Sequence, residues 1–200
     1  MTQAEVLDAG EEAHLIFMRE EEKLARDVYL TLADLYPEEK VFANIAESEQ
    51  THTDTIFFTL EYYRIDDPNP DTNNLPGSIG VFTGEEYGAY FTDTFEYLVG
   101  WGAESLLQGL YVGAFIEELD VLDIVGCPHE IVDADNDIGV GECGLEYTDE
   151  ARLQTMYTNL LEASKNHLRA YVKNIERIIG EGEYEAQMLS QEEVDEILGR

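Results

Sequence analysis

Apolar residues recur every three or four positions along most of the chain, the spacing that places them on one face of an α-helix. Pro37 ends the first of these patterns, because proline cannot continue a helix at that point. A shorter pattern follows over residues 85–99, and a last one lies in SQEEVDEILG, residues 190–199. Four long helices are predicted, over residues 9–36, 38–64, 103–125 and 148–179.

Two segments interrupt the helical periodicity. Residues 66–80 and 126–144 are rich in Pro, Gly, Asn and Asp, a composition typical of surface loops. The first makes a long connection between the second and third long helices. The sequence therefore predicts an all-α four-helix bundle over residues 1–180, followed by an acidic linker and a short helix over 181–200. That last helix begins with a capping-box spacing of Ser and Glu.

The second predicted helix carries acid and imidazole on its apolar face. Residues three and four apart share one side of a helix. Glu49 and His52 therefore point to the same side as Ile45 and Ile56, whereas Glu47 points away and is expected in solvent.

The other long helices repeat this feature. In the first, Glu21 falls within the apolar stripe, Glu22 at its edge and Glu20 on the polar side. In the third, Glu117 lies on the apolar face, and Asp120 and Glu118 lie at its two margins. In the fourth, His167 shares a face with apolar residues.

A buried carboxylate is costly unless a partner neutralises it. Four helices that each direct an acid or an imidazole into one interior predict a shared partner. Carboxylate oxygen and neutral imidazole suit iron, manganese or zinc, and the cations would remove the repulsion between the acids. The alternative is a metal-free structural bundle in which the acids hydrogen-bond to Arg, Tyr and His.

Two motifs resemble those of the ferritin-like superfamily, in particular the rubrerythrin and bacterioferritin group. Glu22, Ala25 and Tyr29 match a first-helix pattern E-x-x-A-x-x-x-Y, and Glu49 with His52 matches a second-helix pattern E-x-x-H. The segments MREEEKLARDVY, FANIAESEQTH, GAFIEELDVLD and SKNHLRAY also resemble an uncharacterised family of ferritin-like domains, DUF2202. This resemblance covers residues 13–171.

The resemblance implies one or two metal ions, above all iron, in the bundle core. The implied ligands are Glu22, Glu49, His52, Glu117 and His167. Asp120 is a further candidate, and Glu21 is the rival to Glu22. The family pattern expects Glu three residues before the last histidine, where this chain has Ser164.

A di-iron site of this kind implies reaction with O₂ or peroxide, as in peroxidase-like or ferroxidase-like oxidoreductases. The chain lacks the CxxC pairs of a rubredoxin-type electron carrier, so an external electron donor would supply the electrons. The rival interpretation is a protein that binds or stores metal without turnover. A homodimer is compatible with either.

The net charge of −33, from 44 acidic against 11 basic residues, changes the picture of partners. Such a surface repels nucleic acid and anionic membranes. The acids are spread along the chain, which favours adaptation of the whole surface to high salt. With no signal peptide and no membrane-spanning run apparent in the sequence, we expect a cytoplasmic protein of a halophilic organism.

The second loop holds the remaining candidates. Cys127 and Cys143 flank it as a disulfide or as two thiols, and with His129 they form an incomplete metal clasp. The segment DADNDIG resembles the start of a calcium loop but lacks the Gly and Glu that such a loop requires, so a solvated acidic loop is favoured. His14 is expected on the surface.

Overall fold

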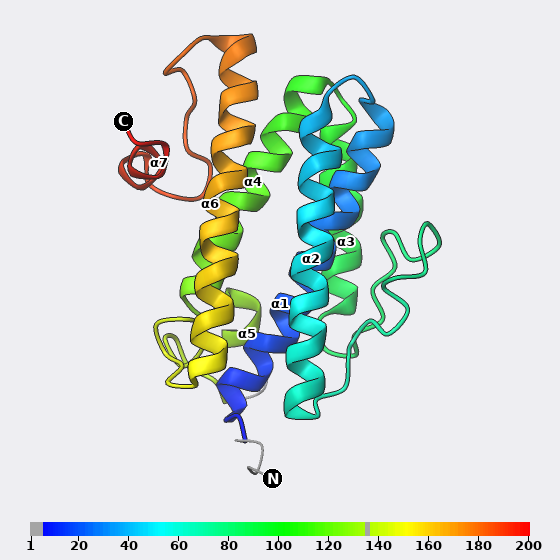
Figure 1. The fold of residues 1–200 in the computed structure, drawn as a ribbon, viewed down its shortest axis with the longest axis vertical. Coiled ribbons are helices and arrows are strands. Elements are labelled where there is room, and N and C mark those ends of the chain that lie inside the picture. The colour runs from blue at the N-terminus through cyan, green and yellow to red at the C-terminus, as the bar shows by residue number, and fades with distance from the viewer. Residues whose placement is uncertain (1–5, 135–136) are drawn as a thin grey trace.

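The computed structural model describes residues 6–134 and 137–200, and within them it contains seven α-helices and no strand (Figure 1). The predicted all-α class is confirmed. The helices are α1 (Ala9–Leu35), α2 (Lys40–Tyr63), α3 (Gly88–Gly102), α4 (Leu106–Val125), α5 (His129–Val132), α6 (Ala151–Ile179) and α7 (Gln191–Leu198).

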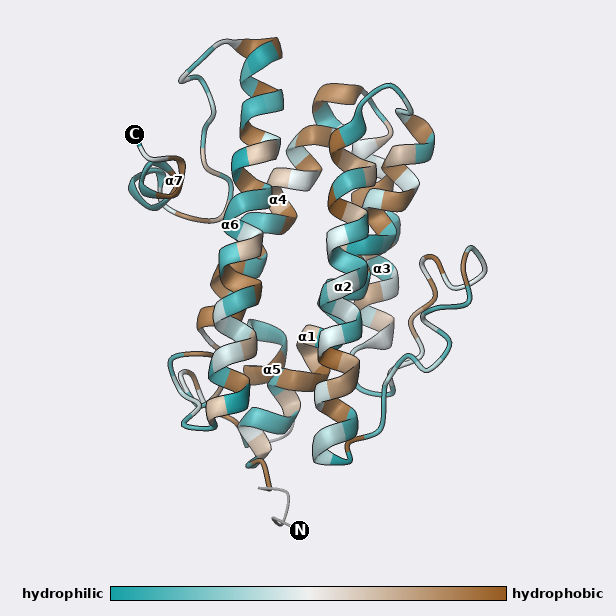
Figure 2. Ribbon diagram, viewed as in Figure 1, coloured by the Kyte–Doolittle hydropathy of each residue, from teal (hydrophilic) through white to brown (hydrophobic). Residues whose placement is uncertain are grey.

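The four long helices lie side by side as two pairs. Helix α1 packs mainly against α2, and α4 packs mainly against α6. The pairs meet through α1 with α4 and α2 with α6, while α3 packs on α1 and α4 (Figure 1). Polar and apolar residues alternate around the long helices (Figure 2), and the apolar faces meet in one core.

The helix ends follow the sequence signals with one exception. Ser190 and Glu193 form the predicted capping box of α7. The fourth long helix was predicted to begin at residue 148, but α6 begins at Ala151, after the N-cap Glu150. The Thr148 hydroxyl donates to the carboxylate of Glu11 on α1.

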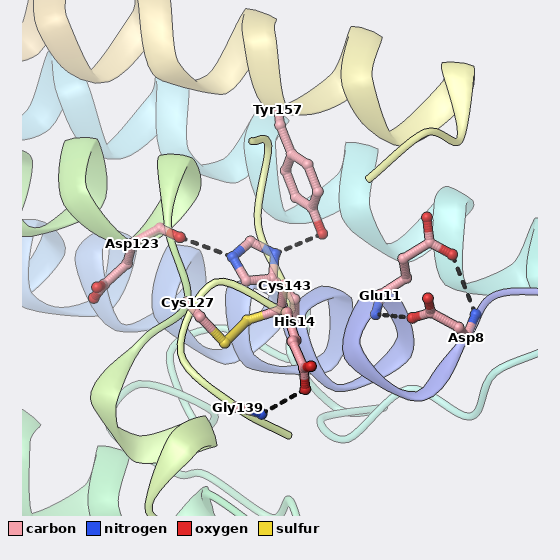
Figure 3. The surroundings of a disulfide bond; sticks show 9 residues. Asp8, Glu11, His14, Asp123, Cys127, Gly139, Cys143 and Tyr157 are labelled. Atoms are coloured by element: carbon pink, nitrogen blue, oxygen red, sulfur yellow. Dashed lines mark hydrogen bonds between the residues drawn. A yellow bond between two sulfur atoms is a disulfide. The ribbon is translucent and has the colours of Figure 1, made fainter. Parts of the chain in front are cut away.

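The loop of residues 126–144 is more ordered than predicted. It contains α5, and a disulfide between Cys127 and Cys143 closes it (Figure 3). The clasp of two thiolates and His129 is therefore excluded, since both sulfurs are bonded to each other. Of the calcium-like segment, Asp135 lies outside the described residues.

The prediction of a surface position for His14 was wrong, because its side chain is fully buried between α1, α4 and α6. Its Nε2 lies 2.7 Å from the carbonyl oxygen of Asp123 and its Nδ1 lies 2.8 Å from the Tyr157 hydroxyl (Figure 3). A carbonyl can only accept, so Nε2 carries the proton and Tyr157 donates to Nδ1. Burial lowers the pKa of His14 to about 4, which keeps the ring neutral.

The polar side of α1 is also covered. The long connection after α2 lies over it, and Arg19, Lys23 and Arg26 are buried there beside acids and loop carbonyl groups. Glu20, expected on the polar side, is fully buried and accepts a hydrogen bond from Asn69 of this loop. Helix α1 is thus enclosed on both sides. No described helix is both long and apolar enough to cross a membrane.

Candidate metal centre

Helices α1 and α2 bring the first group of candidate ligands together. Glu49 and His52 are one helical turn apart on α2 and both face α1, where Glu22 lies opposite. The Nδ1 atom of His52 lies 2.6 Å from Oε2 of Glu49 and 3.1 Å from Oε2 of Glu22. These three ligand atoms fall within 4.8 Å of one another.

Helices α4 and α6 complete a second group around the same glutamate. The Nδ1 atom of His167 lies 2.7 Å from Oε1 of Glu49 and 3.4 Å from Oε2 of Glu117. Glu49 therefore presents one carboxylate oxygen to each histidine. The two groups, Glu22–Glu49–His52 and Glu49–Glu117–His167, share this residue.

Neighbouring hydrogen bonds orient the candidate ligands. The Tyr29 hydroxyl donates to Oε1 of Glu117 at 2.7 Å, which leaves Oε2 free to face the site. The Nε2 atom of His167 lies 3.0 Å from the Ser48 hydroxyl, so its Nδ1 can turn inward. Sequence reasoning missed Ser48, because no motif distinguishes it from other serines of a helix flank.

The carboxylates of this cluster are buried and have too few hydrogen-bond donors around them. Glu22, Glu49 and Glu117 are fully buried, and Asp120 is 1% exposed. Both oxygens of Asp120 and Oε1 of Glu22 lack a hydrogen-bond partner. In the described part of the chain, no Lys or Arg forms an ion pair with any of them.

Electrostatics show how the metal-free cluster shares its protons. Burial raises the pKa of Glu22 to about 8 and also raises the pKa of Asp120. Burial by itself lowers the pKa of His52 and His167, but the adjacent carboxylates outweigh burial and raise them to about 11 and about 10. For Glu49 the two histidines outweigh burial and hold its pKa below the usual range. Protons on His52 and His167 therefore partly neutralise the buried acids of the metal-free cluster.

The structure brings together all five ligands that the resemblance implied, with Asp120 beside them. Asp120 interacts with the carboxylates of Glu22, Glu117 and Glu49. Glu21, the rival to Glu22, is buried but belongs to neither group, and it faces Asp123 instead. Ser164 is buried with its hydroxyl bonded to the carbonyl of Leu160, so it does not replace the expected glutamate.

Comparison with known proteins identifies the family of this chain. The family model described as "Uncharacterized protein domain (DUF2202)" matches residues 11–200. This chain belongs to the DUF2202 family.

A relative of similar length comes from Methanocaldococcus jannaschii. The uncharacterized protein MJ0754 of that organism is 39% identical over 188 residues, which cover 94% of this chain and 86% of MJ0754. The crystal structure of hypothetical protein MJ0754 matches the fold with a TM-score of 0.80 at 36% identity, over 100% of this chain and 98% of that one. This likeness shows that the two chains share a fold.

Proposed function

We propose that this DUF2202 protein is a ferritin-like bundle that binds two transition-metal ions in its core. The observation that supports it most is Glu49, whose two oxygens each face a different histidine Nδ1. One carboxylate placed in this way is suited to bridge two cations. Candidate ligands from all four long helices, α1, α2, α4 and α6, support a ferritin-like site, although α6 has Ser164 where such a site has a second Glu.

In this proposal each ion has its own histidine and its own terminal glutamate. Glu22 and His52 would hold one ion, Glu117 and His167 would hold the other, and Glu49, which belongs to both groups, would contribute to both. Charge supports the assignment: four carboxylates, with Asp120 included, balance two divalent cations when both histidines are neutral. The unpartnered oxygens of Asp120 and Glu22 would then have partners.

Iron is the proposed metal, with manganese or zinc as alternatives. Mixed carboxylate and imidazole ligands suit iron and manganese, whereas structural zinc usually takes four-coordinate sites rich in Cys and His. Bound iron would supply the reduction of O₂ or peroxide. The protein's own contribution is to hold the ions, exclude bulk water and fix Glu117 through Tyr29. The side chains of His52 and His167, 11% and 12% exposed, lie where a small oxidant would enter.

Metal analysis of matched variants tests the proposal. Glu47 lies on α2 two residues before Glu49 but is exposed, so Glu47→Gln removes the same charge outside the cluster. After desalting, the wild type and Glu47→Gln should each retain two ions per chain. Glu49→Gln should lose both ions, because Glu49 is a proposed ligand of both. Wild-type metal content in Glu49→Gln would refute the site.

A second experiment tests Asp120 as the replacement for the missing glutamate. Ser164 precedes His167 by three residues, just as Glu49 precedes His52. Asp120→Ala should lose the more weakly held ion, and Asp120→Ala combined with Ser164→Glu should regain it. Ser164→Ala is the control and should retain both ions. Full metal content in Asp120→Ala would remove Asp120 from the site.

Turnover distinguishes an oxidoreductase from a storage protein. The ferrous-loaded protein is mixed with O₂ or peroxide, and oxidation of the iron is followed optically. An oxidoreductase should repeat the cycle when a chemical reductant replaces the external electron donor. A protein that only stores metal would oxidise its iron once or leave it unchanged.

A further inference from the structure

The basic residues of this acidic chain are concentrated on one helix. Of the 11 Lys and Arg residues, three are buried on the loop side of α1. Four of the remaining eight lie on α6 at intervals of four residues. Residues four apart share one side of a helix, so these four form a strip along α6, called here the basic stripe. It consists of Lys165, Arg169, Lys173 and Arg177.

A pocket of about 650 Å³ lies against the C-terminal half of this stripe, lined by α6, the segment after it and the end of α7. That segment turns back beside α6 before it reaches α7 (Figure 1). Four cations line the pocket, three from the basic stripe and Arg200, together with the acids Glu176 and Glu181 and the apolar side chains of Val172 and Leu198. Pockets of about 300–1,000 Å³ commonly hold small molecules, and this one has an excess of positive charge.

Hydrogen bonds hold the wall opposite α6 in place. The fully buried carboxylate of Glu118 on α4 accepts from the Tyr184 hydroxyl and from three backbone N–H groups at residues 187–189. On α7, the carbonyl oxygen of Ile197 accepts from Nε of Arg169 at 2.7 Å. Both parts of the wall are therefore anchored to the bundle, and the pocket is formed before a ligand binds.

Three of the four cations in the pocket have no acid partner. Arg200 forms an ion pair with Glu176 at 2.6 Å. In the part of the chain that the structure describes, Arg169, Lys173 and Arg177 form no ion pair, although the sequence holds 44 acids against 11 bases. The two arginines donate to the side-chain oxygens of neutral asparagines on α6. Cations left unpaired in so acidic a chain are available to an external anion.

The fold by itself does not account for these cations. The helix dipole stabilises a cation near a helix C-terminus, but this effect is confined to about the last turn. It covers Arg177, the basic residue of the last turn of α6, whereas Lys173 and Arg169 lie further back. Helix α7 is acidic, but among its described residues the acid that forms an ion pair is Asp195, and its partner is Arg200.

We propose that this pocket binds a small polyanion that carries two or more phosphate or carboxylate groups. Guanidinium groups pair with phosphate and with carboxylate through two parallel hydrogen bonds, and Lys173 adds a point charge between the two arginines. Arg169 and Arg177 are eight residues apart, which is about 12 Å along α6. A ligand with several anionic groups therefore engages more of these cations than a single phosphate does.

Calorimetric titration of the metal-free chain with pyrophosphate, and separately with citrate, tests the site and distinguishes phosphate from carboxylate. Without metal, neither probe can bind by chelation. Lys173→Gln combined with Arg177→Gln should raise the dissociation constant about 4- to 25-fold, because each exposed charge pair changes a binding constant about two- to fivefold. Lys40→Gln combined with Arg64→Gln is the matched control, because these exposed residues carry the same charge outside the pocket. The control should bind the probe like the wild type.

Glu176→Gln should change the affinity in the opposite direction. It removes a negative charge from the pocket lining and frees Arg200 from its ion pair with Glu176. The probe should therefore bind about two- to fivefold more tightly. Glu47→Gln removes the same charge from an exposed position on α2 and should leave the affinity unchanged. A gain in affinity cannot come from a variant that only folds poorly.

Two results would overturn the polyanion site. One is a wild type that binds neither probe. The other is equal affinity of the wild type and the Lys173, Arg177 double variant, because binding would then not depend on the pocket. The substituted residues lie outside the proposed metal centre, so every variant should keep the metal content of the wild type. The polyanion site is thus tested independently of the proposed function.

Discussion

Gly113 on α4 packs directly against the ring of Tyr171 on α6, and the substitution Gly113→Ala tests whether this contact positions the proposed metal centre. A Cβ atom at Gly113 would lie 2.3, 2.4 and 2.6 Å from three carbons of the Tyr171 ring. Carbon atoms pack at about 3.5–4.0 Å, so the ring or the helix has to move by about 1 Å. Tyr171 is fully buried and has no free space to enter.

The expected loss follows from two opposing effects. Overpacking of a tight core costs about 1–3 kcal/mol. Alanine recovers up to about 1 kcal/mol, because glycine is a poor helix former. The free energy of unfolding should therefore fall by about 1–2 kcal/mol, which lowers the melting temperature by about 2–8 °C in a chain of this size.

Gly100→Ala is the matched control. Gly100 also lies within a helix, but nothing lies within 4 Å of an added Cβ atom. This variant should gain about 0.5–1 kcal/mol from helix propensity alone. Urea unfolding of the metal-free variants measures both values. If Gly113→Ala proved as stable as Gly100→Ala, the reasoning would be refuted.

The same substitution should weaken one metal position more than the other. Glu117 follows Gly113 by about one turn of α4, and His167 precedes Tyr171 by about one turn of α6. A shift between these helices would separate Glu117 from His167 and leave Glu22 and His52 on α1 and α2 in place. Desalted Gly113→Ala should therefore retain about one ion per chain. Retention of both ions would show that the proposed metal centre tolerates the shift between α4 and α6.

Four further predictions concern charge. Asp27→Ala should cost about 3–5 kcal/mol in urea unfolding, because it leaves Lys23 and Arg26 buried without their counter-ion; a loss below about 1 kcal/mol would contradict this. In the metal-free protein the pKa of His52 is raised to about 11 and that of His167 to about 10. Their contribution to stability is therefore fully present below the unfolded pKa near 6.5 and is lost as the pH rises through about 10 to 11. Metal binding near pH 7.5 should displace these protons, and calorimetry in buffers of different ionisation enthalpy should find release of about two or more per chain; no release would refute the assignment of the histidines as ligands. Finally, the net charge of −33 predicts that the melting temperature falls from molar to millimolar salt, whereas an unchanged value would argue against adaptation to high salt.

The sequence predicted the helices and most of the candidate ligands because both depend on local spacing. Glu49 and His52 share a face of α2 whatever packs against it, and the same spacing logic placed Glu117 and His167 inward. The sequence could not show that Glu49 lies between both histidines, since this depends on how α6 is positioned against α2. The sequence also could not show that the Asp120 carboxylate has no hydrogen-bond donor.

The hydrophobic periodicity also failed to predict that the polar side of α1 is buried. An amphipathic pattern identifies one apolar face, and it predicts solvent on the opposite face. Glu20 is buried because a loop distant in sequence covers that polar side of α1. His14 is buried because its polar ring satisfies both nitrogens, one through a hydroxyl and one through a carbonyl. Such partners come from other elements, so no local pattern reveals them.

The two sides of α1 neutralise their buried acids differently, and this difference supports the proposed metal centre. On the loop side, Asp27 accepts hydrogen bonds from Lys23, Arg26 and the backbone N–H of Gly80, so its buried charge is matched within the protein. On the inner side, the protonated His52 faces Oε2 of Glu22, but Oε1 of Glu22 and both oxygens of the equally buried Asp120 have no hydrogen-bond donor. A metal-free structural bundle would require those acids to be matched in the same way as Asp27. The chain has only 11 basic residues, and three of them, Arg19, Lys23 and Arg26, are buried on the loop side of this same helix. Among the described residues, no Lys or Arg forms an ion pair with the acids of the inner side, and this difference supports the proposed metal centre.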